Sequence, residues 1–516
     1  MPYIRLELPL NVPSAYCKQD SGFSCNRSSS SESSGEVKGE SLYSDLASQD
    51  AESEFSEIES GSLPRNDSNH LHEEIEESQT HMETSNEDQE EEEEKTMVSS
   101  PSAQKQQTNK MNNLQDQIEL LLLDNSKPLP SRFNAMFYLR AIGNDSAIRC
   151  LIKTVVEISV NFNDLLEHEI THILGQMIGI ADHEVVDAHK FMETDIYGEV
   201  KDALEKILSD DTRSPVTRHE AGESLAAILS VDSLSLLDKY SSEEYEIHEE
   251  VRHTCHVAAS KIRWYVSVKN RIENEQKNAN ANANANENQN NQNCVTISQK
   301  LNNRNPFLTV DPAPPLNILQ GHLFPDGVYD ANDDYKSKYQ AYLSELVLEA
   351  VAKFTDPSED LFVRYRCLST LRNELIHDLI SISGPNLKDL HVEIVNALIA
   401  GLYCPSSALL RHEVGFNLGQ ILSLPNIADP ENAETRDKIL DGLEKSVNDD
   451  NEADMVRHES STGFGECCHN DDRSKRMLEK FAGEDKAAIL RDSCIVTLNM
   501  AQNNEEWLAA QFGFKL

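Results

Sequence analysis

The sequence lacks several features that mark large classes of proteins. None of its 516 residues lies in an apolar run near the roughly 18 residues that a membrane-spanning helix needs. Its first residues, MPYIRLELPLNVP, contain no continuous apolar core of the kind found in secretory signals. Its ten cysteines are scattered without a CxxC pair, which is typical of reduced thiols rather than of a disulfide framework. We therefore expect a cytoplasmic protein, with the nucleus as a second location, and no membrane partner.

Basic residues are scarce as well. The chain has 46 Lys and Arg against 89 Asp and Glu, a net charge of -43. Proteins that bind phosphate backbones need clustered Lys and Arg, so we expect no nucleic-acid partner. An acidic chain instead suits a basic or amine-bearing substrate.

Residues 1–110 are acidic and rich in Ser, Asn and Gln, with runs at Ser28–Ser31 and Glu90–Glu94. Such a segment buries too little apolar surface to offset its conformational entropy. We therefore expect it to be disordered.

The rest of the chain contains an internal repeat. The order of segments is the same in two halves: an R-[FY] segment, two segments with a His-Glu pair, and a closing VRxTC or LRDSC segment. The four His-Glu segments are EHEITHILGQM from Glu167, RHEAGESLAAI from Arg218, RHEVGFNLGQI from Arg411 and RHESSTGFGEC from Arg457.

The repeat length predicts a fold of stacked helix pairs. Arg218 and Arg252 are 34 residues apart, and so are Arg457 and Arg491. Repeats of that length with helical periodicity are typical of a helix-pair solenoid. We expect an all-α protein with two pseudo-symmetric halves, 111–266 and 356–516. Between them we expect a linker, 267–355, with an Asn/Ala-rich tract and a Pro-rich segment.

The His-Glu pairs predict a metal site. Adjacent helix residues point about 100° apart and can flank one groove. Pairs at the same phase in stacked repeats would bring four imidazoles and four carboxylates into one cleft. Nitrogen and oxygen ligands without cysteine suit divalent iron, manganese or zinc. The alternative is that the pairs belong to the repeat consensus and only make helix–helix hydrogen bonds.

One of these segments also fits another motif. The sequence HEITH, from His168 to His172, matches the H-E-x-x-H pattern of zinc peptidases. The repeat argues against this hypothesis, because the adjacent Glu never varies whereas the position four residues after the histidine does. We therefore expect His172 to be incidental. That variable position holds His172, Glu223, Phe416 and Thr462.

At these residues the sequence resembles the deoxyhypusine hydroxylases, a family of HEAT-repeat enzymes with four His-Glu motifs. The resemblance covers most of 125–265 and 300–505. It implies a HEAT-like helical-repeat solenoid. The matching motifs include PLPSRFNAMFYLR from Pro128, VTRHEAGES from Val216, VDPAPP from Val310 and LFVRYRCLSTLRN from Leu361.

The resemblance implies a non-haem di-iron monooxygenase with two Fe(2+) per chain. Its substrate would be the deoxyhypusine form of translation initiation factor 5A, with molecular oxygen and a reductant as further partners. By motif, one iron would bind His168, His219 and Glu220, and the other His412, His458 and Glu459. Glu169 and Glu413 would be catalytic residues that hold the amines of the substrate. Further substrate-binding positions would be Gly175, Gly419 and Met455.

The sequence departs from the family at several places. After Glu459 the fourth motif continues SSTGFGECC, where the family has small and acidic residues, and this could loosen the packing behind Glu459. His253 and His256 are interpreted as surface substitutions. Competing hypotheses are a non-enzymatic HEAT-repeat scaffold for protein interaction, a repeat protein of the bilin-lyase type, and the zinc peptidase.

Overall fold

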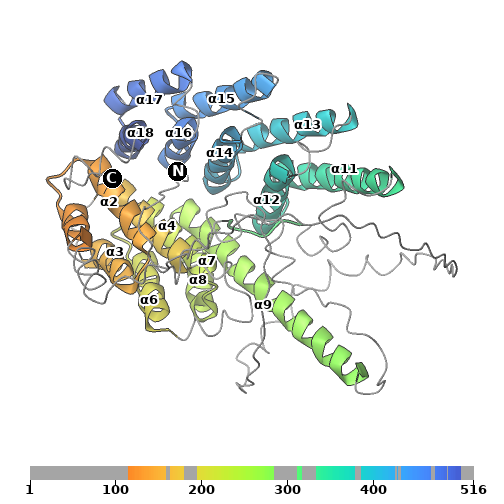
Figure 1. Cartoon of the computed structure of the whole chain (residues 1–516), viewed down its shortest axis with the longest axis horizontal. Coiled ribbons are helices and arrows are strands. Elements are labelled where there is room, and N and C mark those ends of the chain that lie inside the picture. Colours follow the sequence, from red (N-terminus) through yellow and green to blue (C-terminus); the bar gives the residue numbers. More distant parts are fainter. Residues whose placement is uncertain are drawn as a thin grey trace, which may run out of the picture.

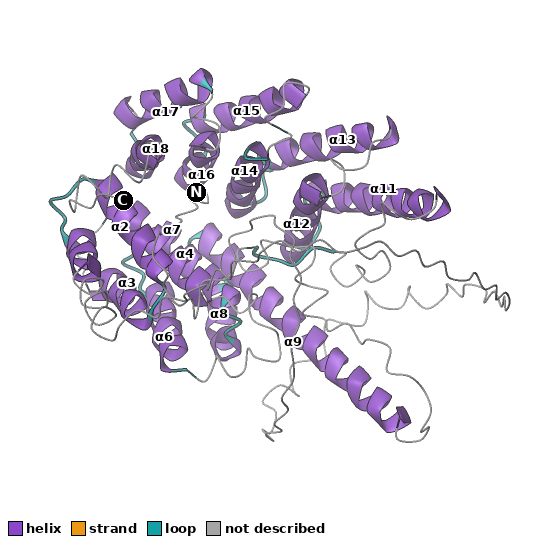
Figure 2. Ribbon diagram, viewed as in Figure 1, coloured by secondary structure: helices purple, strands orange, loops and turns teal. Residues whose placement is uncertain are grey.

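The computed structural model describes residues 114–157, 163–178, 194–283, 311–316, 333–377, 385–424, 427, 432–465, 471–484 and 486–500. The segment expected to be disordered, 1–110, lies outside the described residues, and so do 284–310 and 317–332 of the linker. In the described ranges every regular element is a helix and no strand occurs (Figure 2). No described helix is long and apolar enough to cross a membrane.

The first half begins with a helical segment over 114–123 and ends with a long helix. Its labelled elements are α2 (Leu129–Ile142), α3 (Asp145–Glu157), α4 (Asp164–Ile178), α6 (Asp195–Ser209), α7 (Pro215–Ala227), η3 (Val231–Ser233), α8 (Leu234–Tyr240) and α9 (Glu249–Ala283). Helices α2, α4, α7 and α9 form the inner row, and α3, α6 and α8 lie outside them (Figure 1).

The second half repeats this arrangement. Its helices are α11 (Asp333–Thr355), α12 (Leu361–His377), α13 (Pro385–Gly401), α14 (Ala408–Leu422), α15 (Ala433–Asn448), α16 (Asp454–Gly465), α17 (Asp472–Glu484) and α18 (Ala488–Met500). The even-numbered helices α12 to α18 form the inner row and the others the outer rim (Figure 1). This confirms the expected all-α solenoid with two pseudo-symmetric halves.

An arginine at the same place in several repeats ties each inner helix to the outer helix before it. In each case the Nε–H donates to a backbone carbonyl ten residues earlier, near the end of the preceding helix. A cation there satisfies carbonyls that the helix leaves unpaired and complements the helix dipole. The R of the second and fourth His-Glu motifs is therefore a structural residue. The four bonds are Arg132 to Leu122 (2.9 Å), Arg218 to Leu208 (3.0 Å), Arg364 to Phe354 (3.0 Å) and Arg457 to Val447 (2.9 Å).

The two halves contact each other at both ends. Helix α18 inserts Ile489, Val496 and Met500 into the core of the first half, and α9 contributes Val257 to the core of the second. The Asn163 amide, just before α4, donates to the Asp492 carboxylate of α18 at 2.6 Å. The inner rows of the two halves therefore face one another across the middle of the molecule.

The helices extend into the range that the sequence assigned to the linker, which corrects its boundaries. Helix α9 continues to Ala283, and α11 already begins at Asp333. The α11 side chains Val347, Ala350 and Phe354 are fully buried in the second core. Helix α11 is thus the first outer helix of the second half. The Pro-rich segment before it favoured assigning this range to the linker.

Candidate metal centre

The four His-Glu pairs all lie on inner helices: α4, α7, α14 and α16. Their histidines are almost completely buried, with exposed fractions of 5% for His168, 0% for His219, 7% for His412 and 0% for His458. Buried polar groups of this kind carry a large desolvation penalty unless they are paired or bound to an ion. Because water does not reach these imidazoles, another interaction must compensate the cost of burying them.

The four imidazole rings form one cluster. The ring of His168 lies 5.5 Å from that of His219, 5.5 Å from that of His458 and 6.5 Å from that of His412, measured between centroids. The rings of His219 and His412 are 5.2 Å apart. Two histidines from each half therefore converge in one place, as the repeat predicted.

The Nε2 atoms of all four histidines are buried and have no hydrogen-bond partner among the described residues. His219 lacks a partner at Nδ1 as well. Buried polar atoms are almost always hydrogen-bonded in native proteins. Four imidazole nitrogens without a hydrogen bond in one cluster are therefore an arrangement suited to bind metal ions.

The carboxylates of the second and fourth motifs lie beside these nitrogens. Glu220 Oε2 is 3.2 Å from His168 Nε2. Glu459 Oε2 is 3.3 Å from His458 Nε2 and 3.8 Å from His412 Nε2. Two ligands that each bind one ion at about 2.0–2.2 Å are themselves roughly 3 Å apart. These spacings fit shared ions.

The tautomer of His458 follows from its neighbour on α18. The Ser493 hydroxyl donates its one proton to the Ile489 carbonyl at 2.5 Å. It can therefore only accept from His458 Nδ1, which lies 2.6 Å away. Nδ1 carries the ring proton and Nε2 keeps its lone pair, the state that metal binding requires. Ser493 is a positioning residue that the closing LRDSC segment supplies.

Electrostatics favours neutral imidazoles at three of the four positions. Burial lowers the pKa of His219, His412 and His458, and neighbouring imidazoles lower it further. Burial also opposes protonation of His168. The carboxylates of Glu169 and Glu220 outweigh that effect and raise the pKa of His168 to about 10.

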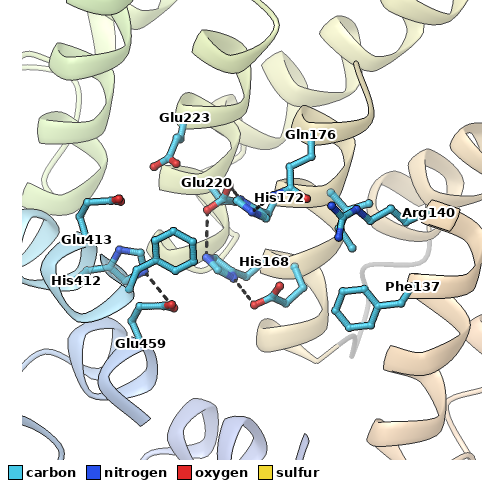
Figure 3. Close-up of a pocket in the computed structure, with 13 residues that line it drawn as sticks. Phe137, Arg140, His168, His172, Gln176, Glu220, Glu223, His412, Glu413 and Glu459 are labelled. Carbon is cyan, nitrogen blue, oxygen red and sulfur yellow. Dashed lines mark hydrogen bonds and ion pairs between the residues drawn. The ribbon is translucent and has the colours of Figure 1, made fainter. Parts of the chain in front are cut away.

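Glu169 and Glu413 line a cavity that borders this cluster (Figure 3). Glu169 Oε1 lies 3.4 Å from His168 Nδ1, and this contact lowers the pKa of Glu169 although burial opposes it. Burial, with Glu223 and Asp311 nearby, raises the pKa of Glu413 well above its usual range. The pocket around Glu413 thus has an excess of acidic groups over bases.

His172, which the repeat predicts to be incidental to metal binding, lies at the cavity beside Glu220. Its Nδ1 lies 2.7 Å from Glu220 Oε1, and its Nε2 lies 2.8 Å from the Gln176 amide nitrogen. His172, Glu220 and Glu223 form a group of potential ligands. The equivalent positions in the second half hold Phe416 and Thr462, so the two halves differ here.

Gly175, Gly419 and Met455 are not among the residues that line the cavity. A Cβ on Gly175 would lie 2.9 Å from the Ser224 Cα of α7, and one on Gly419 2.8 Å from the Gly463 Cα of α16. Met455 is buried in the second core. The two glycines thus allow close helix approach, and all three positions lie in packing contacts.

The substitutions noted from the sequence are accommodated. Ser460, Ser461 and Thr462 are buried, and the Thr462 hydroxyl donates to Glu459 Oε1 at 3.1 Å. These side chains therefore pack behind Glu459 and do not loosen the structure there.

The two additional histidines on α9 lie where the halves meet, partly exposed. His253 contacts the Ser407 hydroxyl and His256 the Asp360 carboxylate. Cys467, Cys468 and His469 are outside the described residues.

Several residues that line the cavity were not found by sequence reasoning. Phe137 and Arg140 of α2 and Gln176 of α4 line the cavity. The R-[FY] segment carries no His-Glu pair and so received no functional role. The R-[FY] segment lies directly before the first His-Glu segment in the repeat, and this position could have indicated that it borders the site.

The fold and the site define a class: an all-helical repeat protein with a buried cluster of His and Glu in the cleft between two halves. Comparison with known proteins gives the family. A deoxyhypusine hydroxylase-B of Oryza sativa subsp. japonica is 30% identical over 393 residues, 76% of this chain and 94% of the relative. The chain belongs to the deoxyhypusine hydroxylase family.

Further relatives have the same name. The deoxyhypusine hydroxylases of Drosophila melanogaster and Mus musculus are each 28% identical, covering 75% and 73% of this chain and 92% and 88% of the relatives. The solved structure of human deoxyhypusine hydroxylase in complex with glycerol is 26% identical with a TM-score of 0.49, covering 77% of this chain and 98% of that one. A score below 0.5 establishes no common fold, so the assignment rests on the sequences. No family model matches.

Proposed function

We propose that this chain is a deoxyhypusine monooxygenase, which hydroxylates the deoxyhypusine side chain in the precursor of translation initiation factor 5A to give hypusine. The observation that carries the proposal is the cluster of four imidazole nitrogens without a hydrogen bond beside two carboxylates, in a chain of this family. We further propose the cytoplasm as its location, with the nucleus as a second one.

We propose that the His and Glu cluster binds two Fe(2+) ions per chain. His168, His219 and Glu220 would hold one, and His412, His458 and Glu459 the other. Nitrogen and oxygen ligands in a 2-His-1-carboxylate set are typical of non-haem iron and leave positions open. When bound, the iron ions supply the redox chemistry that activates molecular oxygen, with electrons from an external reductant.

Glu169 and Glu413 would bind the cationic amines of the substrate. Both are buried carboxylates at the cavity, and neither is needed to complete the two ligand sets. Burial raises the pKa of Glu413, and the negative charges of Glu223 and Asp311 raise it further. An ammonium group would supply a compensating positive charge and hold the aliphatic chain of the substrate across the metal cluster.

The protein itself also excludes water from the reacting carbon. Phe137, Ile173 and Phe416 give the cavity apolar walls between its acidic groups. Desolvation strengthens the amine–carboxylate contacts, which fixes the orientation of the flexible substrate chain.

The competing hypotheses are less well supported. A non-enzymatic scaffold gives no reason to bury four imidazoles without partners. A zinc peptidase would use His168 and His172 on one ion, whereas the cluster joins histidines of both halves.

The direct test is incubation of the iron-loaded protein with deoxyhypusine-containing factor 5A, oxygen and a reductant. Mass spectrometry should detect the gain of one oxygen atom on the modified lysine. The Glu413→Gln variant should bind iron normally but hydroxylate poorly. If the wild-type protein retains two irons and never modifies the factor, the proposed function is wrong.

A further inference from the structure

The cavity contains an arginine whose counterpart in the other half is already paired. Arg140 and Arg372 each lie eight residues after the structural arginine of their segment, Arg132 or Arg364. Those two structural arginines make the same bond to a carbonyl ten residues earlier. Arg140 on α2 and Arg372 on α12 are therefore equivalent positions in the two halves.

In the second half the arginine is paired with a carboxylate. Arg372 is completely buried, and its Nη1 and Nη2 donate to Asp311 Oδ1 and Oδ2 at 2.6 and 2.5 Å. Its Nη1 also lies 3.2 Å from Gln420 Oε1. This two-pronged contact is the strongest common geometry between a guanidinium and a carboxylate.

Asp311 belongs to a short non-helical segment, 311–316, that lies along α12. The Ser369 hydroxyl donates to the Ala313 carbonyl at 2.8 Å, and Arg366 Nε donates to the Pro314 carbonyl at 3.2 Å. The second half thus holds a non-helical peptide with one acidic side chain against the helix that carries Arg372.

In the first half the equivalent place is open. Arg140, Phe137 and Gln176, the counterparts of Arg372, Ser369 and Gln420, all line the cavity (Figure 3). Within the described part of the chain the Arg140 guanidinium makes no hydrogen bond or ion pair.

We propose that Arg140 binds a carboxylate of the substrate protein near the modified lysine, as Arg372 binds Asp311. The inference rests on the proposed function and adds a specificity contact to it. Arg140 lies on the α2 side of the cavity and Glu413 on the opposite side (Figure 3). A substrate with an acidic group beside an amine-bearing side chain would then bind in one orientation only.

The test is steady-state kinetics of the full-length, iron-loaded protein with the substrate protein. Arg140→Gln should raise KM roughly tenfold or more, since a hydrogen bond to a charged group is lost, and the rise should exceed any fall in kcat. Arg140→Lys keeps the charge but loses the two-pronged geometry of the guanidinium. Its KM should lie between those of the wild type and of Arg140→Gln. Iron content and thermal unfolding show whether either variant is folded and loaded.

Arg149→Gln is the matched control. Arg149 lies on α3, exposed and paired with Glu199 at 2.8 Å, so this variant loses the same charge away from the cavity. Its KM should equal that of the wild type. An equal rise in both variants would show a long-range charge effect and overturn the proposal.

The acidic partner is found by replacing Asp and Glu of the substrate protein, one at a time, with Asn and Gln. One replacement should raise KM for the wild type but not for Arg140→Gln. The proposal is overturned if no replacement shows this non-additivity. It is also overturned if Arg140→Gln leaves KM unchanged. A lowered KM would overturn it too, and would assign Arg140 to an acidic segment of this chain. A wild-type protein without any hydroxylation contradicts the proposed function instead.

Discussion

The imidazole rings of His219 and His412 lie 5.2 Å apart, although the two residues belong to different halves of the chain. No single repeat contains both. Their contact depends on α9 packing against α12 and α14, and on α18 packing against α2 and α4. The metal centre is therefore a product of the way the two halves close on one another.

Glycine at two inner-helix positions should be essential for the close packing of neighbouring inner helices within each half. Gly175→Ala would place a Cβ 2.9 Å from the Ser224 Cα, and Gly419→Ala one 2.8 Å from the Gly463 Cα. Because backbone must move, each substitution should destabilise the protein by roughly 1–3 kcal/mol. Chemical denaturation of the metal-free protein measures this.

Gly198→Ala is the control for that prediction. A Cβ at Gly198, inside α6, meets nothing within 4 Å. Alanine there should stabilise the helix by a few tenths to about 1 kcal/mol. If all three substitutions had the same effect, close helix approach would not explain Gly175 and Gly419.

His172 should act as a positioning residue for Glu220. Its Nδ1 lies 2.7 Å from Glu220 Oε1, a contact that orients the carboxylate. His172→Phe, which copies the second half, should weaken iron binding at one of the two sites by about tenfold or more. An anaerobic titration with a competing chelator measures both sites. Unchanged affinities would reduce His172 to a bystander, and complete loss of both metals would favour the peptidase-type site.

Much of this site could be predicted from the sequence, because the repeat fixes the phase of each His-Glu pair. The four clustered histidines, and the equivalence of the halves, follow from that phase alone. Arg140 and Gln176 could not be found in this way, since one helix pattern serves both for packing and for lining a cavity. The role of Gly175 likewise depends on the distance to α7, which periodicity does not contain.

The buried pair of Arg372 and Asp311 should be important for stability. Both side chains are 1% exposed. Asp311→Ala would leave the Arg372 guanidinium buried without its main counter-charge, which should cost about 3–5 kcal/mol. Glu199→Ala, which removes the exposed partner of Arg149, should change the unfolding midpoint little. Equal effects of the two substitutions would contradict the assigned role.

Iron binding should depend on pH because of His168. Its pKa in the metal-free protein is raised to about 10 by the neighbouring carboxylates, against the effect of burial. Iron must displace that proton, so apparent affinity should rise about tenfold per pH unit near neutrality. The protonated pair stabilises the metal-free protein fully below about pH 6.5, and this contribution is lost as pH rises through the folded pKa. Chelator titrations near pH 6, 7 and 8 that give one constant affinity would contradict this.

The most direct test of the account is the number of Fe(2+) ions bound per chain in the wild type and in four single variants, His168→Ala, His219→Ala, His412→Ala and His458→Ala. We predict two ions per wild-type chain and the loss of at least one in every variant, because each imidazole completes a ligand set. A single bound ion in the wild type, or full binding after substitution of His412 or His458, would contradict a centre built from both halves.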